Sequence, residues 1–142
     1  MQRQKGFTLL ELLVVISIIG ILASLTLVSY TGAQKQARDT QRRSDLSQYR
    51  NALETYASSN NGLYPDSLST IVGLCTVLSP SYMSTCPSDP TTGNSYGFYS
   101  SASGDGYVVY GGLETTGGYW EVCSTGRSGN FETEPDDSSC DL

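Results

Sequence analysis

The chain of 142 residues contains no histidine. The common Ser-His-Asp and Cys-His catalytic arrangements therefore cannot be built from it. Its four cysteines include no CxxC pair, so the usual signature of a Cys-only zinc site is also missing. Acidic pairs in the tail, Glu132 with Glu134 and Asp136 with Asp137, are interpreted as a solvated loop rather than a general acid/base pair or a calcium site. We expect no enzyme and no cofactor.

Basic residues are scarce in the second half of the chain. Arg127 is the only one beyond position 50, and the formal net charge is −6. Nucleic-acid binding needs a basic face, so we predict no nucleic-acid binding by the isolated C-terminal part. Arg3 and Lys5 precede the apolar segment, and the other five basic residues cluster after it. We interpret these five as a solvated helix face or, alternatively, as contacts to anionic lipid headgroups or to acidic neighbours. They are Lys35, Arg38, Arg42, Arg43 and Arg50.

Charge is absent from 12–34, where leucine, isoleucine and valine dominate. This stretch meets the length of roughly 20 residues that a membrane-spanning helix needs. A cleaved secretory signal is the alternative, but its apolar region usually runs about 7–15 residues. The longer run, which continues into a helical pattern without a turn, favours a retained span. Glu11 is the only charge between Lys5 and Lys35, and an ionisable residue at the edge of such a run is a functional candidate.

A helical pattern continues beyond the span. Apolar residues recur at steps of three and four, as on one face of a helix: Leu46, Tyr49, Leu53 and Tyr56. Opposite charges four residues apart predict two supporting pairs, Asp39 with Arg43 and Arg50 with Glu54. We expect one helix from about residue 7 to 58, ended by Asn60, Asn61 and Gly62 in left-handed conformations.

The C-terminal part predicts a small sheet. Segments 95–101, 107–114 and 119–125 are rich in aromatic and β-branched residues, and Asp105-Gly106 and Gly117-Gly118 suit tight turns between them. We predict a three-stranded antiparallel meander, a short helix near 67–74 and an irregular tail over 126–142. The apolar stripe of the long helix would cover the sheet, which gives an α+β fold.

All four cysteines follow the span. An even number in a small domain suggests two disulfides formed in an oxidising compartment, so we place this part outside the cytoplasm. The positive-inside tendency favours the opposite orientation. Four cysteines allow three pairings. We prefer Cys75 with Cys86 and Cys123 with Cys140, because each pair is close in sequence.

The stretch Gly6-Phe7-Thr8-Leu9-Leu10-Glu11, after a short basic leader, resembles the processing site of type IV pilins and the related pseudopilins of type II secretion. The following residues, up to the "NGLYP" loop, resemble the family's second helical half. The resemblance implies that a prepilin peptidase cleaves between Gly6 and Phe7 and methylates the new amine. Gly20 matches a glycine where family helices loosen in filaments. Val28 stands where many members have proline, the residue that would break the helix.

The resemblance also implies a domain plan and a function. Residues 1–6 would be the leader, 7–34 the transmembrane and filament-core helix, 35–60 its amphipathic continuation, and 61–142 a disulfide-stapled head. The chain would be anchored in the membrane with its N-terminus in the cytoplasm, and the pilus assembly machinery would then polymerise identical subunits into an extracellular type IV pilus. Phe7 and Glu11 would make the assembly contact. The alternatives are a type II secretion pseudopilin and a non-polymerising, membrane-anchored adhesive or binding protein.

Processing after Gly6 is the first testable prediction. Mass spectrometry of the mature protein is expected to find Phe7, methylated, at the N-terminus. Recovery of a chain that starts after Ala23 would instead identify an ordinary secretory signal.

Overall fold

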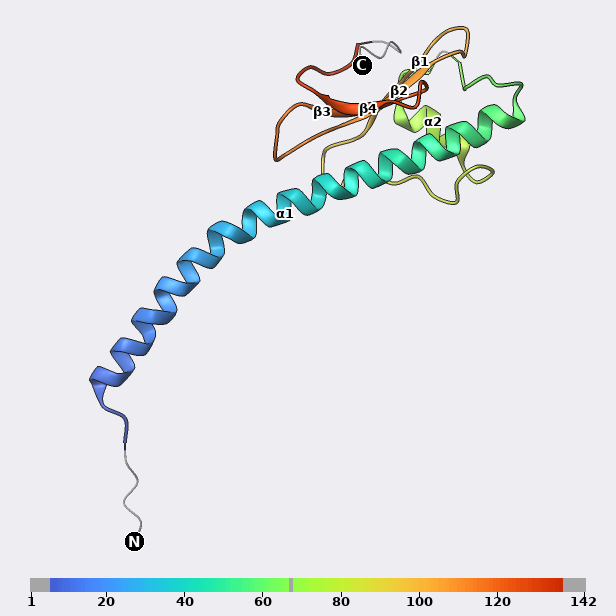
Figure 1. Cartoon of the computed structure of the whole chain (residues 1–142). Coiled ribbons are helices and arrows are strands. Elements are labelled where there is room, and N and C mark those ends of the chain that lie inside the picture. Colours follow the sequence, from blue (N-terminus) through green and yellow to red (C-terminus); the bar gives the residue numbers. More distant parts are fainter. Residues whose placement is uncertain (1–5, 67, 137–142) are drawn as a thin grey trace. The chain divides into compact units, whose positions relative to one another are not determined.

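The computed structural model describes residues 6–66 and 68–136, without the side chains of 26–28. This part of the chain contains two helices and four strands. The helices are α1 (Leu9–Ser59) and α2 (Ile71–Leu78) (Figure 1). The strands β1 (Gly97–Ser100), β2 (Tyr107–Gly112), β3 (Tyr119–Cys123) and β4 (Ser128–Phe131) form one antiparallel sheet in the order β1-β2-β3-β4. The predicted α+β class is confirmed. The chain separates into two compact units, residues 1–35 and 36–142.

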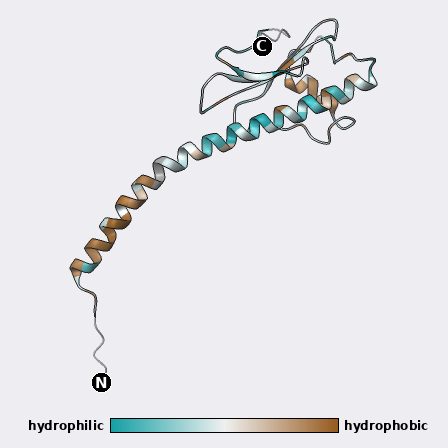
Figure 2. Ribbon diagram, viewed as in Figure 1, coloured by the Kyte–Doolittle hydropathy of each residue, from teal (hydrophilic) through white to brown (hydrophobic). Residues whose placement is uncertain are grey.

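Helix α1 ends at Ser59, next to the predicted residue 58, but Asn60 does not take the predicted left-handed conformation. Asn61 and Gly62 have φ of 59° and 80°, the left-handed region that asparagine and glycine tolerate. The Gly62 N–H donates to the Ala57 carbonyl at 2.8 Å, which satisfies one of the last helical acceptors. The composition of α1 changes along its length, from a hydrophobic first half to a hydrophilic second half (Figure 2).

The second half of α1 supplies one side of the core. Leu46, Tyr49 and Leu53 are buried against the inner face of the sheet, which contributes residues such as Phe98 and Val109. Burying a large apolar side chain is worth about 1.5–3 kcal/mol. Each element thereby covers the apolar surface of the other, and the predicted packing of helix on sheet is confirmed.

The sheet has one strand more than the predicted meander. Strand β4 lies in the tail that we predicted to be irregular, so that prediction is wrong for Ser128–Phe131. Gly126, with φ of 81°, turns the chain after β3, and the Cys123 N–H donates to the Arg127 carbonyl at 3.0 Å. The strand has only four residues, of which Phe131 alone is large and apolar, so it shows no apolar alternation. Its position is determined by the turn at the left-handed Gly126 and by backbone pairing with β3.

Two other local predictions differ from the structure. The β1–β2 turn places its left-handed residue at Gly104, with φ of 70°, rather than in the Asp105-Gly106 pair. The Ser101 hydroxyl accepts from both N–H groups of that pair, so side-chain hydrogen bonding shapes the turn. The short helix begins at Ile71, later than predicted, because the Thr70 hydroxyl caps it by accepting from the Gly73 N–H. Gly117 and Gly118 both have positive φ, as a tight turn requires.

The cysteine pairing is visible in part. A disulfide joins Cys75 of α2 to Cys86 in the following loop, with 6.0 Å between the Cα atoms. Cys123 is disulfide-bonded. Cys140 lies outside the described residues, so its predicted link to Cys123 stays a prediction.

A buried ionic cluster fixes two loops on α1. Arg42 is fully buried and donates to Asp39 at 2.7 Å and to Asp89 at 2.7 Å and 3.0 Å. It also pairs with Glu114 at 2.8 Å, and the Arg38 guanidinium binds both oxygens of that carboxylate. The solvated-face interpretation is therefore wrong for Arg42 and Arg38.

Asp39 anchors the β2–β3 loop from the same cluster. Its carboxylate accepts the N–H groups of Glu114 and Thr115 and the Thr115 hydroxyl. Burial raises the pKa of Asp39, but these hydrogen bonds outweigh burial and lower it overall. The predicted pair with Arg43 is not among the ion pairs of the described residues; Arg43 instead lies over the Trp120 ring at 4.4 Å.

The predicted pair of Arg50 with Glu54 is likewise absent from the described ion pairs. Glu54 accepts from the hydroxyls of Tyr64 and Tyr107 instead, at 3.2 Å and 3.1 Å. Tertiary contacts thus replace both of the local charge pairs that the helical spacing predicts.

Arg42→Ala is expected to destabilise the head by about 3–5 kcal/mol, because it leaves buried carboxylates without their counter-charge. The measurement is denaturant unfolding of the full chain in detergent, followed by near-UV circular dichroism. Arg43→Ala is the matched control, since an exposed cation–π contact is worth about 0.5–1 kcal/mol. If both variants lost the same free energy of unfolding, the buried ion pairs of Arg42 would contribute no more to stability than an exposed contact.

Glu114 makes the head sensitive to acid. The hydrogen bond from Arg38, helped by Arg42 and Thr91, lowers the pKa of Glu114 from 4.5 to about 2. The ionised Glu114 carboxylate therefore stabilises the folded head fully above its ordinary pKa of 4.5, and this stabilisation is lost as the pH falls toward 2. We expect Glu114→Gln to be less stable than wild type at neutral pH and the difference to shrink between about pH 5 and pH 2. Unfolding midpoints across that range test this, with the exposed Asp66→Asn as a control that leaves the profile unchanged.

Candidate functional site: the processing and assembly segment

The predicted cleavage bond precedes the first turn of α1. Gly6, Phe7 and Thr8 are outside regular secondary structure, and Phe7 is 91% exposed. No heavy atom approaches a Cβ placed on Gly6 within 4 Å. A bond in exposed, irregular backbone is open to a peptidase, in contrast to one within a hydrogen-bonded helix. The geometry is therefore compatible with processing between Gly6 and Phe7, which stays a prediction.

Thr8 and Glu11 form a capping box at the start of α1. The Thr8 N–H and the Thr8 hydroxyl both donate to Glu11 Oε2 at 2.9 Å, and the Glu11 N–H donates to the Thr8 hydroxyl at 3.2 Å. Reciprocal bonds of this kind satisfy helical N–H groups that lack an intrahelical acceptor. The sequence-based prediction of Glu11 as an assembly residue omits this contact, although the Thr-x-x-Glu spacing signals it.

The cap uses one oxygen of the carboxylate. Both Thr8 donors go to Oε2, and Oε1 receives no hydrogen bond from the described residues. A carboxylate at a helix N-terminus is also favoured by the helix dipole. Glu11 is thus held in a fixed orientation while keeping an oxygen available for a second donor.

The first half of α1 presents a predominantly apolar surface. Its large apolar side chains from Leu9 to Leu25 are all exposed, and the helix is long and apolar enough to cross a membrane by length and composition. The hydroxyls of Ser17 and Ser24 donate to the carbonyls of Leu13 and Ile21, so they carry no unmet donor into an apolar phase.

Helix α1 continues through Gly20 and Val28. The loosening expected at Gly20 concerns the assembled state and stays a prediction. A Cβ on Gly20 would meet no atom within 4 Å, so no packing within the chain explains a glycine there.

The head, residues 36–142, contains no stronger candidate for a functional site among its described residues than the start of α1. No three His, Cys, Asp or Glu side chains of the described residues gather as a metal site. A hollow of about 370 Å³ lies beside the start of α2, and Glu134 on its wall accepts from the hydroxyls of Tyr110 and Tyr119. These groups satisfy one another, so the apolar helix with its capped N-terminus is the stronger functional candidate.

Comparisons with known proteins point to the same segment. The family model described as the prokaryotic N-terminal methylation motif matches residues 1–27. Type II secretion system core protein G of Escherichia coli (strain K12) is 32% identical over 144 residues, which cover 94% of this chain and 89% of that protein. The corresponding protein of Aeromonas hydrophila is 47% identical over 60 residues, 42% of each chain.

A pilus protein is also similar. The type IV wide pilus major component PilA4 of Thermus thermophilus is 38% identical over 74 residues, 52% of this chain and 56% of that protein. No solved structure matches. The methylation motif lies over the capped, exposed start of α1, and the similarity to a core protein G extends through the head. On these grounds the chain belongs to the family of type IV pilins and type II secretion pseudopilins.

Proposed function

We propose that this protein is a structural subunit that polymerises through the first half of α1 into a filament. The carrying observation is that this apolar surface is exposed along its whole described length. Such a surface is stable in lipid before assembly and against identical helices afterwards. The subunit is anchored with its N-terminus in the cytoplasm, loses residues 1–6 to the prepilin peptidase, and is delivered by the assembly machinery. Its role is mechanical, without catalysis.

The charged pair at the N-terminus sets the register of the filament. Cleavage creates an amine on Phe7, and a staggered neighbour brings its Glu11 Oε1 to that amine inside the apolar core. A charge pair at about 4 Å is worth on the order of 4 kcal/mol at an effective dielectric near 20. Removing both charges from water offsets much of that gain. The pair therefore selects one axial stagger, because every other stagger buries the charges without a partner.

Two assemblies are candidates for the filament. A type II secretion pseudopilus comes first, because the similarity to core protein G of Escherichia coli extends over nearly the whole chain. A type IV pilus, favoured from the sequence, is the second candidate and rests on the similarity to PilA4 over about half of the chain. The comparisons do not favour the pilus over the pseudopilus.

Glu11→Val and Glu11→Gln together test the assembly contact. Glutamine can still accept from Thr8 and complete the capping box, whereas valine cannot. We expect both variants to enter the membrane and to be cleaved after Gly6, but to yield few or no filaments, because both lack the negative charge for a neighbour's amine. Each variant is expressed as the only subunit copy, its accumulation is checked by membrane fractionation, and sheared filaments are counted.

Normal filament yield from Glu11→Gln with loss only in Glu11→Val would assign Glu11 to capping rather than register. Normal yield from both would leave Glu11 as a boundary residue of the apolar segment.

Deletion of the gene separates the two assemblies. Loss of a secretion pseudopilus is expected to leave exported proteins in the periplasm, whereas loss of a pilus is expected to remove long surface fibres seen by electron microscopy. Complementation with the wild-type chain and with Glu11→Val controls for effects on neighbouring genes.

A further inference from the structure

Strand β4 leaves an open edge of the sheet. It is the last strand in the order β1-β2-β3-β4. The Cys123 N–H donates to the Arg127 carbonyl, and bonded and non-bonded pairs alternate along an antiparallel ladder. The backbone groups of Gly129 and Phe131 therefore face β3, whereas those of Ser128 and Asn130 face away from it.

These outward N–H and C=O groups have no hydrogen-bond partner in the part of the chain that the structure describes. Ser128 and Asn130 are both exposed. An unpaired edge of this kind is a template on which a further strand can add. Small side chains at Ser128, Gly129 and Asn130 leave space for another backbone to approach.

The opposite edge of the sheet is occupied. On β1, the Ser100 N–H donates to the Leu68 carbonyl at 2.9 Å, and the Ser100 hydroxyl accepts from the Leu68 N–H at 3.0 Å. The segment before α2 thus covers this end of the β1 edge. A contact between β4 of one copy and β1 of another would have to displace it.

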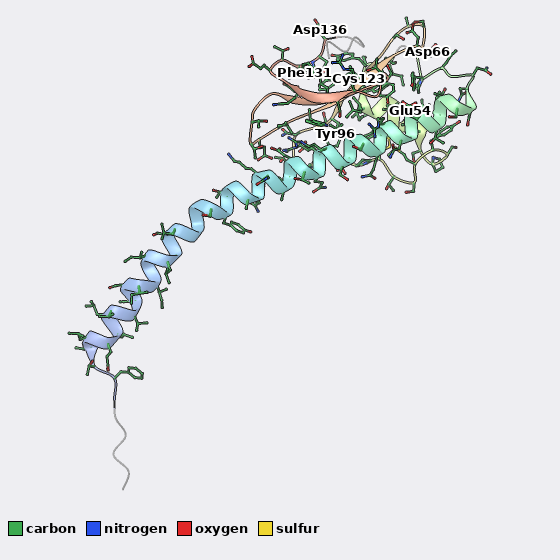
Figure 3. The ribbon with its side chains drawn as sticks, in the orientation of Figure 1. Glu54, Asp66, Tyr96, Cys123, Phe131 and Asp136 are labelled. Carbon is green, nitrogen blue, oxygen red and sulfur yellow. A yellow bond between two sulfur atoms is a disulfide. The ribbon has the colours of Figure 1, made fainter. Side chains whose placement is uncertain are left out.

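Charge is distributed with opposite signs at the two ends of β4. Arg127, the only basic residue beyond position 50, immediately precedes the strand, and the exposed Glu132 immediately follows it. Phe131 at the end of β4 and Asp136 beyond it are labelled in Figure 3. If two β4 strands pair antiparallel, the basic end of each lies beside the acidic end of the other. Parallel pairing would place like charges together.

We propose that β4 is an interface between two copies of this chain, paired antiparallel about Gly129. Ser128 of each copy then exchanges both backbone hydrogen bonds with Asn130 of the other, and the two sheets become one continuous sheet. The pairing is self-complementary in backbone groups and in charge. Those two properties identify a second copy as the occupant of the edge.

The symmetry of this contact determines where it acts. A self-complementary pair has a two-fold axis and closes on itself, whereas head-to-tail contacts build open helical filaments. The β4 contact therefore joins heads of two different filaments, or two unassembled subunits. Each contact is weak, but a filament repeats it many times, so filaments associate side by side. This consequence rests on the proposed function; the pairing of heads does not.

Asn130→Pro and Asn130→Ala test the pairing by sedimentation equilibrium of the full chain in density-matched detergent. The Asn130 N–H faces away from β3, so proline there removes no bond to β3. Alanine removes the contact between the Asn130 side-chain amide and the Thr116 hydroxyl but keeps the outward N–H. We expect wild type and Asn130→Ala to form a reversible dimer, and Asn130→Pro to raise its Kd at least about tenfold. Near-UV circular dichroism checks that both variants fold.

Charge reversal gives a second readout that does not depend on proline. Arg127→Glu and Glu132→Arg are each expected to weaken the dimer, and the double variant is expected to restore it. Added salt should weaken the wild-type dimer, since the end charges are exposed.

A wild-type chain that stays monomeric up to about millimolar concentration, the range of weak contacts, would overturn the proposal. So would a dimer that is indifferent to Asn130→Pro and to the charge changes, because it would form through another surface such as the apolar helix. Filaments that form normally but never associate laterally would remove only the inferred consequence. A chain that dimerises through β4 but never forms filaments would contradict the proposed function and leave the β4 interface intact.

Discussion

The apolar half of α1 has no apolar partner among the residues that the structure describes, and this constraint shapes the interpretation of the rest of the molecule. Its side chains are exposed from Leu9 to Leu25, so the surface needs lipid or other helices. The second half of the same helix has the opposite property, because its stripe at Leu46, Tyr49 and Leu53 is fully covered by the sheet. One continuous helix therefore carries an exposed apolar surface in one half and part of the core of the head in the other.

Glu11 shows how a costly charge is tolerated in such a segment. Before assembly its Oε2 accepts two hydrogen bonds from Thr8, so the carboxylate is partly satisfied without any other molecule. Oε1 accepts no hydrogen bond from the described residues and is open for a further donor. In the proposed filament the new partner is added to the capping box, because the two contacts use different oxygens. Two donors of its own chain and one amine of a neighbour would then together offset the free energy of removing the carboxylate from water.

The features that could be predicted from the sequence are those that depend on residues close together in the chain. The apolar residues at steps of three and four predicted the stripe that faces the core, in which Leu46, Tyr49 and Leu53 are buried and Tyr56 is partly buried. The Asn61-Gly62 pair predicted the helix end, and the aromatic segments predicted β1 to β3. Strand β4 was not predictable, because three of its four residues are polar or small, a single phenylalanine is too weak a strand signal, and pairing with β3 orders the segment. The partners of Asp39 and Glu54 were not predictable either, since nothing local signals contacts to residues far away in the chain.

Charge counting was misleading for a related reason. The cluster from Lys35 to Arg50 suggests a basic surface, yet Arg42 is buried among carboxylates and Arg38 is bound to Glu114. These two arginines neutralise carboxylates of their own head, so they add nothing to a basic surface. Residues 36–142 contain 13 acidic and 5 basic residues, so heads brought together in the proposed filament repel one another overall. Attraction has to come from the apolar helices, from the pairing of Glu11 with an amine, and from surfaces where the local charge pattern is self-complementary. Net charge thus confines favourable contacts between heads to a few sites, and this restriction makes an edge with opposite charges at its two ends a selective interface.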